Sequence, residues 1–212
     1  MNSKGGVGKT TLSVAITDMM ELANRVPHLI EVDSRKRLSS FMGEENVLSF
    51  DGAPPIAEIR KDSNALLKHY DPIIAELEKG DSLIDLGANE DAPFLEYCKL
   101  SRIDEDLEDM GIDALVLIPT VAETDSINGA LSAVDAVREI VPSASIVLVL
   151  NERDSSNFNL HFDARRLSDL REAGVTVMVM PRIMSEGWED FQRAKHRFVD
   201  IISMEPAQLM EQ

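Results

Sequence analysis

Near its amino end the chain reads Ser3-Lys4-Gly5-Gly6-Val7-Gly8-Lys9-Thr10-Thr11. The glycines allow the backbone to curl so that successive N–H groups point at an anion, and a helix beginning near Lys9 adds the positive end of its dipole. The Lys9 side chain can then reach the outer phosphates, and the Thr10 hydroxyl is placed to ligate Mg²⁺. The segment therefore predicts a loop that binds the phosphates of a Mg²⁺-bound nucleoside triphosphate.

A loop of this kind normally follows a buried strand, which gives it a rigid base. Only Met1, Asn2 and Ser3 precede the loop in this sequence. We therefore expect that the first strand of the fold is missing or truncated, and that a strand of about six residues belongs upstream. A chain that is complete as written would have a frayed loop and a low affinity for nucleotide.

Segments rich in Val, Ile and Leu, each as long as a buried strand, alternate with segments of helical length. The strands are predicted at 28–33, 82–86, 113–119, 145–150 and 175–180. The helices are predicted at 9–24, 62–79, 91–110, 125–140, 162–173 and 186–203. Strands that are apolar throughout, with helices between them, indicate a parallel sheet covered on both faces. We predict an α/β fold with a three-layer, doubly wound, mostly parallel sheet of the P-loop NTPase type. It would form a single domain over residues 1–212, with 44–61 as a surface connection.

Composition excludes several classes of function. The 212 residues carry 38 acidic and 21 basic side chains, a formal net charge of −17, and such a surface repels polyanions unless its bases are clustered. A single cysteine, Cys98, rules out an internal disulfide and is expected to be a packed thiol. The apolar runs are too short to span a bilayer and the amino end is not a signal peptide, so we expect a cytoplasmic protein.

The segment from Lys4 to Thr11 resembles the deviant Walker A motif of the ParA/MinD family of dimeric ATPases. The resemblance implies that Lys4 reaches across a nucleotide-sandwich dimer to the partner's phosphates, whereas the residues alone also allow a solvated surface lysine. It further implies an ATP-dependent homodimer in which Lys4, Lys9 and Asp33 are the catalytic residues. The nucleotide would lie on the whole loop, formed by Gly5, Gly6, Val7, Gly8, Lys9, Thr10 and Thr11.

Two acidic residues at predicted strand ends complete the expected site. Strand 28–33 ends in Glu31-Val32-Asp33, and Asp33 matches the family's acid that positions the water attacking the γ-phosphate, with Glu31 standing where an aspartate is usual. A turn or helix-capping role for Asp33 stays open. Strand 82–86 resembles a Walker B strand, in which Asp85 would hold a Mg²⁺-bound water beside the Thr10 hydroxyl. Thr10 and Asp85 are therefore the predicted metal-site residues.

The far strands supply the candidates for the base pocket. Asn151 ends strand 145–150 at the edge where open α/β sheets bind ligands, and the resemblance suggests that it contacts the purine. Glu152 stands where guanine-specific motifs have lysine, which favours adenine. Pro181 and Arg182 follow the last strand and could line the pocket or form an ordinary strand exit.

The expected partners follow from the same resemblance. The segment Arg193 to Arg197 is the one candidate DNA patch, although the sequence favours an ordinary solvated helix face there. An adaptor protein is the other candidate partner. The acidic segment 203–212 argues against a membrane-targeting helix. The leading prediction is a Mg²⁺-dependent, slowly hydrolysing switch ATPase for plasmid partition, positioning or conjugative transfer.

Two alternatives remain open at this point. One is a degenerate nucleotide-binding scaffold without turnover. The other is a small-molecule kinase or ligase that shares the phosphate loop, against which the early lysine, Lys4, counts.

Overall fold

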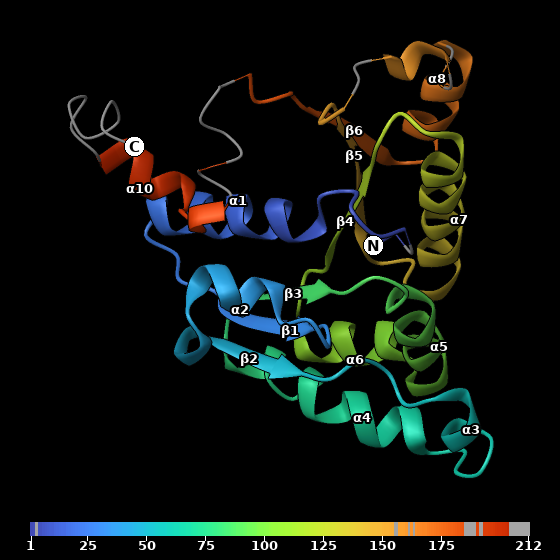
Figure 1. The fold of residues 1–212 in the computed structure, drawn as a ribbon. Coiled ribbons are helices and arrows are strands. Elements are labelled where there is room, and N and C mark those ends of the chain that lie inside the picture. The colour runs from blue at the N-terminus through green and yellow to red at the C-terminus, as the bar shows by residue number, and fades with distance from the viewer. Residues whose placement is uncertain are drawn as a thin grey trace.

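The computed structural model describes residues 1–2, 4–154, 157–160, 162, 164–184, 190 and 193–203. Within these residues the strands form two three-stranded parallel sheets flanked by helices (Figure 1). The sheet orders are β2-β1-β3 and β4-β5-β6, so each sheet is built from a contiguous half of the chain. The predicted α/β class and parallel strands are confirmed, but the strands lie in two sheets rather than one.

The first sheet carries helices on both of its faces. Its central strand β1 (His28–Val32) pairs in parallel with β2 (Val47–Phe50) on one side and β3 (Ser82–Leu86) on the other. One face packs on α4, α5 and α6 through an apolar cluster centred on Ile30, Tyr70 and Tyr97. The other face packs on α1 and α2 through a smaller cluster. The bounds of these helices are α1 Lys9–Leu22, α2 Arg37–Met42, α4 Ala65–Ile74, α5 Asp91–Ser101 and α6 Ile103–Met110.

The second sheet is built from β4 (Leu115–Thr120), β5 (Ser145–Asn151) and β6 (Val175–Met180), with β5 in the middle. Its covered face packs on α7 (Thr124–Ile140) and α8 (Ala164–Glu172). From Ile146 to Asn151 the residues of β5 are buried, as expected for a central strand that is apolar throughout. The short helix α10 (Phe198–Ser203) contacts α1.

The amino end of the chain lies between the two sheets. The Met1 amine donates a hydrogen bond to the Leu117 carbonyl of β4, and the Met1 side chain packs against the cores of both halves. The buried Asn2 amide donates to the Pro119 carbonyl at 3.0 Å and to the Ser126 carbonyl at 3.1 Å. Met1 and Asn2 form no strand, so the segment before the loop is fastened to the second sheet by a few contacts.

Two predictions about the connections were wrong. The segment 44–61 is not only a surface connection, because it contains β2, a 3₁₀ turn (Glu44–Asn46) and the short helix α3 (Ile56–Ile59). The predicted helix 91–110 is broken at Arg102, whose φ of 59° ends α5 and begins α6. Further 3₁₀ turns lie at Leu77–Lys79 and Asn157–Leu160.

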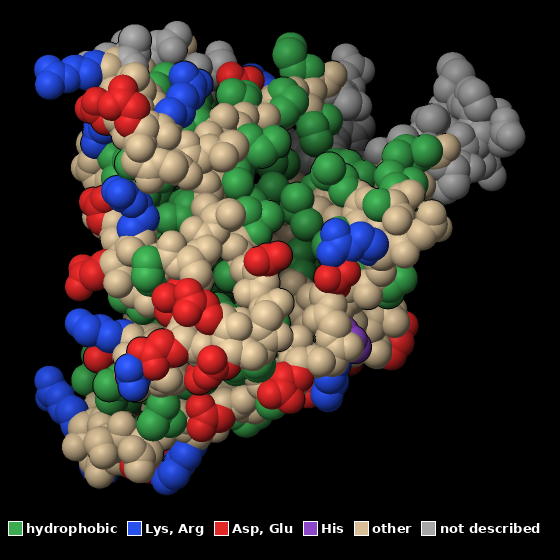
Figure 2. All heavy atoms as spheres, turned by 180° about the vertical axis from the view of Figure 1, so that it is seen from behind, with side chains coloured by type: hydrophobic (Ala, Val, Ile, Leu, Met, Phe, Trp, Pro, Cys, Tyr) green, Lys and Arg blue, Asp and Glu red, His purple; other side chains and the backbone are tan. Residues whose placement is uncertain are grey.

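Other predictions concern single residues or the surface. Cys98 is buried, and burial raises the pKa of its thiol to about 12, which confirms a packed thiol. Among the described residues no helix is both long and apolar enough to cross a membrane. Figure 2 shows the molecule from behind, with apolar side chains gathered in the upper half of the view and acidic side chains more numerous below. Segment 204–212 and, within the predicted helix 186–203, residues 186–189, 191 and 192 lie outside the described residues.

Candidate functional site

The predicted loop, apart from Ser3, which lies outside the described residues, leads into α1 at the carboxyl ends of the strands. Parallel strands place their carboxyl ends at one edge, and β1 and β3 are paired so that Glu31 lies opposite Asp85. In the other sheet, Asn151 ends β5 and reaches the same loop, because its side chain contacts Val7. This edge is where ligands of open α/β sheets bind, so the fold brings the predicted residues of both halves to one place.

The backbone of the loop has the conformation that its glycines permit. Gly6 and Gly8 have φ values of 77° and 94°, in the left-handed region that other residues rarely adopt. A Cβ at Gly8 would also lie 2.4 Å from the Asn151 amide nitrogen, so no larger residue fits there without moving Asn151. The first turn of α1 carries no acidic residue, which leaves the positive end of the helix available for an anion.

The Lys9 side chain folds back over its own loop. Its Nζ donates to the carbonyl of Asn2 at 2.6 Å and to the carbonyl of Lys4 at 3.4 Å. Burial lowers the pKa of Lys9, while the nearby carboxylates of Asp91 and Asp85 act in the opposite direction. The ammonium is therefore held against the backbone at the start of its own loop.

The two predicted metal-site residues are in direct contact. The Thr10 hydroxyl donates to one oxygen of Asp85 at 2.8 Å, and the Ser13 hydroxyl donates to the other at 3.1 Å. Burial raises the pKa of Asp85 to about 6, partly offset by these two hydrogen bonds. A hydroxyl and a carboxylate are hard oxygen donors of the kind that Mg²⁺ prefers, so the residues present fit this ion.

Ser13 is a site residue that the motif analysis missed. It lies three positions after Thr10 on α1, and this spacing places two side chains on the same face of a helix. The spacing was visible in the sequence, although nothing in the motif itself marked the serine.

Asp33 directly follows β1 and has a side chain that is 9% exposed. One of its oxygens accepts the Arg35 N–H at 3.0 Å, and the other lies 3.6 Å from Arg37 Nε. A Cβ at Gly87 would lie 2.9 Å from Asp33 Cγ, so this carboxyl group packs closely against the chain that leaves β3. Asp33 thus lies at the predicted edge and also makes the local turn contact that the sequence left open.

Glu31 accepts hydrogen bonds from α2 and β2 that its position in the motif did not predict. Its side chain is fully buried and accepts the Leu38 N–H at 2.6 Å, the Ser39 hydroxyl at 2.9 Å and the Ser49 hydroxyl at 3.1 Å. The carboxylate therefore caps the first turn of α2 and ties that helix to β2.

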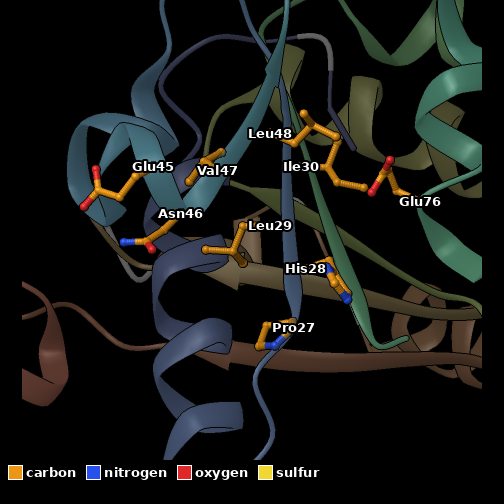
Figure 3. A pocket seen from close by; sticks show the side chains of 9 residues that line it. All are labelled: Pro27, His28, Leu29, Ile30, Glu45, Asn46, Val47, Leu48 and Glu76. Atoms are coloured by element: carbon orange, nitrogen blue, oxygen red, sulfur yellow. The ribbon is translucent and has the colours of Figure 1, made fainter. Parts of the chain in front are cut away.

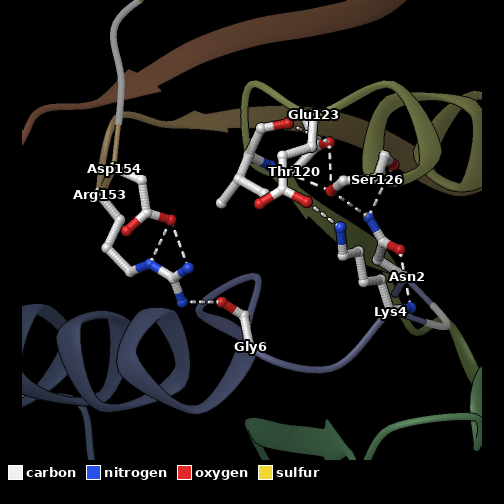
Figure 4. Close-up of polar contacts among 9 residues, drawn as sticks. Asn2, Lys4, Gly6, Thr120, Glu123, Ser126, Arg153 and Asp154 are labelled. Carbon is white, nitrogen blue, oxygen red and sulfur yellow. Dashed lines mark hydrogen bonds and ion pairs between the residues drawn. The ribbon is translucent and has the colours of Figure 1, made fainter.

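Lys4 is paired within its own chain. Its ammonium forms an ion pair with Glu123, the residue that precedes α7 (Figure 4). The Lys4 N–H donates to the Asn2 side chain at 3.1 Å, and Asn2 in turn binds Ser126 in the first turn of α7. The start of the loop is thus attached to the start of α7.

Asn151 and Arg153 contact the loop from the end of β5. The Asn151 amide donates to the Val7 carbonyl at 3.0 Å, and its oxygen accepts the Arg153 N–H at 3.1 Å. The Arg153 guanidinium donates to the Gly6 carbonyl (Figure 4). Arg153 is a second site residue that sequence reasoning missed, because no motif marks it and only the fold brings it to the loop.

The remaining base-pocket candidates lie beside Asn151 without reaching the loop in the part of the chain described. Pro181 and Arg182 directly follow β6, where Met180 is the register partner of Asn151, and both are exposed. The Glu152 N–H donates to the Met180 carbonyl at 2.9 Å, which continues the pairing of the two strand ends.

The candidate DNA patch is partly neutralised by acidic side chains. Arg193 pairs with Asp190 at 3.0 Å. Arg197 Nη2 lies 2.5 Å from Asp18 and 2.7 Å from Glu21, which joins the segment before α10 to α1. These two guanidinium groups are therefore committed to contacts within the chain.

A separate hollow of about 320 Å³ lies at the amino ends of β1 and β2, away from the loop (Figure 3). Its lining includes Pro27, His28, Asn46 and Glu76. Since His28 begins β1 whereas the loop residues gather beyond the end of β1, this hollow is not part of the candidate nucleotide site.

Comparisons with known proteins add no assignment. No protein-family model matches the chain, and a search of curated protein sequences finds no match. The candidate function therefore depends on the residues and their geometry.

Proposed function

We propose that the chain binds ATP with Mg²⁺ at the loop 4–11 and hydrolyses it slowly, as a switch ATPase of the ParA/MinD type. The observation that carries this proposal is the contact of 2.8 Å between the Thr10 hydroxyl and the Asp85 carboxylate. The two residues are 75 positions apart, and one comes from the loop and the other from the end of a neighbouring strand. A coincidental glycine-rich turn would not require this pairing.

The proposed roles of the residues follow from their positions. The loop amides and the start of α1 would hold the phosphates, and Lys9 would contact their outer oxygens. Thr10 and Asp85 would hold Mg²⁺, which when bound neutralises charge on the triphosphate. Asp33 would orient the attacking water, for which its carboxylate must exchange its contacts with Arg35 and Arg37.

The two sheets would be the halves of one doubly wound P-loop fold. Both are parallel, the loop lies at the carboxyl ends of their strands, and Met1 packs against the cores of both. A loop placed between two half-sheets is typical of nucleotide sites at a topological switch point.

Dimerisation is the less direct part of the proposal. Lys4 would act on the phosphates of a second copy, after exchanging its ion pair with Glu123 for that contact. The ion pair is partly exposed, with side-chain exposures of 34% and 53%, so its exchange costs little. Plasmid partition or transfer support is the biological setting that the resemblance suggests for such a dimer.

Phosphate release tests the hydrolytic part. We expect slow Mg²⁺-dependent release from ATP by the wild type and a background rate for Asp33→Ala. We also expect ATP to shift the wild type to a dimer in sedimentation, with loss of the shift in Lys4→Ala. Dimerisation that Lys4→Ala leaves unchanged would remove the proposed role of Lys4.

A second candidate is a scaffold that binds nucleotide without turnover. The contacts of Asp33 with Arg35 and Arg37 favour it, because they occupy the carboxylate that would otherwise orient water. Equal background rates of phosphate release in the wild type and Asp33→Ala, with nucleotide binding retained in both, would select this scaffold.

A further inference from the structure

The end of β5 makes contacts with the phosphate loop that the predicted roles do not explain. Two consecutive loop carbonyls, those of Gly6 and Val7, each accept a side-chain hydrogen bond from this strand end. The donors are Arg153 and Asn151, which are separated by one residue. Loop carbonyls that point outward leave the loop N–H groups free to point inward, which is the arrangement that an anion requires.

We propose that Asn151 and Arg153 form a clamp that sets the conformation of the phosphate loop, with both acting as positioning residues. The inference rests on the proposed nucleotide site and adds to it a specific function for the 151–154 segment. The clamp acts through the loop backbone, so it would favour binding of any triphosphate irrespective of its base.

The contacts within the segment hold both donors in place. The Asn151 oxygen accepts the Arg153 N–H at 3.1 Å, so the asparagine amide is oriented with its nitrogen towards Val7. Arg153 Nε donates to Asp154 at 2.7 Å, which directs the guanidinium towards Gly6. Asn151 is 5% exposed, and its amide donates to the loop and accepts from Arg153.

The steric contacts agree with the hydrogen bonds. A Cβ at Gly6 would lie 3.5 Å from Arg153 Nη1, and one at Gly8 would lie 2.4 Å from Asn151 Nδ2. Two of the loop glycines are therefore covered directly by the clamp side chains. A loop that is covered in this way has fewer conformations to lose when it binds phosphate, and such preorganisation increases affinity.

Equilibrium binding of three ligands with Mg²⁺ separates the clamp from contact with the base. The ligands are ATP, GTP and inorganic tripolyphosphate, and the variants are Arg153→Gln and Asn151→Ala. We expect each variant to weaken binding of all three ligands by a similar factor of about ten, since each loses a buried or charge-assisted hydrogen bond to the loop. Arg171→Gln, an exposed arginine on α8, is the matched control and should bind as the wild type does.

Two outcomes of this experiment would overturn the clamp. One is unchanged binding by Arg153→Gln and Asn151→Ala. The other is weaker binding of ATP and GTP with unchanged binding of tripolyphosphate, which would place these side chains on the nucleoside.

Hydrogen exchange provides a readout that needs no ligand. We expect the amides of residues 5–8 to exchange about tenfold faster in Arg153→Gln, with exchange in α7 and β5 unchanged. Equal exchange in the loop would contradict the clamp. If the wild type binds none of the three ligands, the proposed function fails, and the exchange experiment still decides whether the clamp exists.

Discussion

At the scale of single residues, the buried charge of Asp85 lowers the stability of the fold, whereas the proposed function requires that charge. It is buried beneath the loop, and its pKa of about 6 lies above its ordinary value of 3.8 because burial disfavours the charged form. The hydrogen bonds from the Thr10 and Ser13 hydroxyls offset only part of the free-energy cost of burying this charge. A buried carboxylate kept at a stability cost is expected where the charge serves a ligand.

Asp85→Asn should therefore stabilise the fold near neutral pH. The folded state holds the Asp85 proton more tightly than the unfolded state, because the pKa is raised on folding. The group therefore adds to the free energy of unfolding below its unfolded pKa, and this contribution is lost as the pH rises through about 6. We expect Asp85→Asn to raise the free energy of unfolding at pH 7.5 by on the order of 2 kcal/mol, with the gain vanishing near pH 4. Urea unfolding measures this, with the exposed Asp113→Asn as the control. A variant less stable than the wild type at pH 7.5 would contradict the argument.

The same pKa predicts how Mg²⁺-dependent nucleotide binding varies with pH. Mg²⁺ requires an ionised carboxylate, so protonation of Asp85 competes with the metal. Between pH 7 and pH 5 the affinity for ATP with Mg²⁺ should fall by about tenfold. Protonation of ATP itself contributes to such a profile, and the residual binding of Asp85→Asn over the same range corrects for it. Identical profiles for the two proteins would show that Asp85 does not hold the metal.

At the scale of elements, the attachment of α2 to the first sheet depends on Glu31. This fully buried carboxylate accepts hydrogen bonds from Leu38, Ser39 and Ser49, which belong to α2 and β2. Glu31→Gln keeps the size of the side chain but loses the charge and replaces one acceptor by a donor. We expect the free energy of unfolding to fall by about 2 kcal/mol. The exposed Glu44→Gln should change it little, and equal effects of the two substitutions would mean that the cap contributes nothing specific.

The longer strands were predictable because each is a continuous apolar run. The predicted segments 145–150 and 175–180 agree with β5 and β6 to within one residue. In contrast, β2 has only four residues at the edge of its sheet, one of which, Val47, is buried. Its pairing with β1 depends on tertiary contacts such as the bond from Ser49 to Glu31, which no local pattern encodes.

The break between α5 and α6 could not be predicted from residue type. It occurs at Arg102, a residue without the conformational freedom of glycine, in a left-handed conformation. Packing of Ile103 and Leu107 in the core of the first sheet accompanies this turn. Tertiary contacts here override the helical propensity of the segment.

At the scale of the whole molecule, the site was predictable where a motif marks it and not where distant segments meet. Thr10 and Asp85 could be paired from sequence because each belongs to a recognisable element, and the structure brings them together. Glu123 and Arg153 reach the loop from the ends of β4 and β5, at sequence separations above one hundred residues. No spacing rule connects such positions, so only the fold reveals them.

Calorimetric titration of ATP with Mg²⁺ into the whole chain measures whether the loop 4–11 binds a nucleotide. We expect saturable binding at one site, weakened at least about tenfold in Lys9→Ala through loss of the charged contact to phosphate. Lys99→Ala, which removes an exposed lysine on α5, should bind as the wild type does. Absence of binding by the wild type would mean that the loop is not a nucleotide site, and equal affinity of Lys9→Ala would mean that Lys9 does not contact the phosphates.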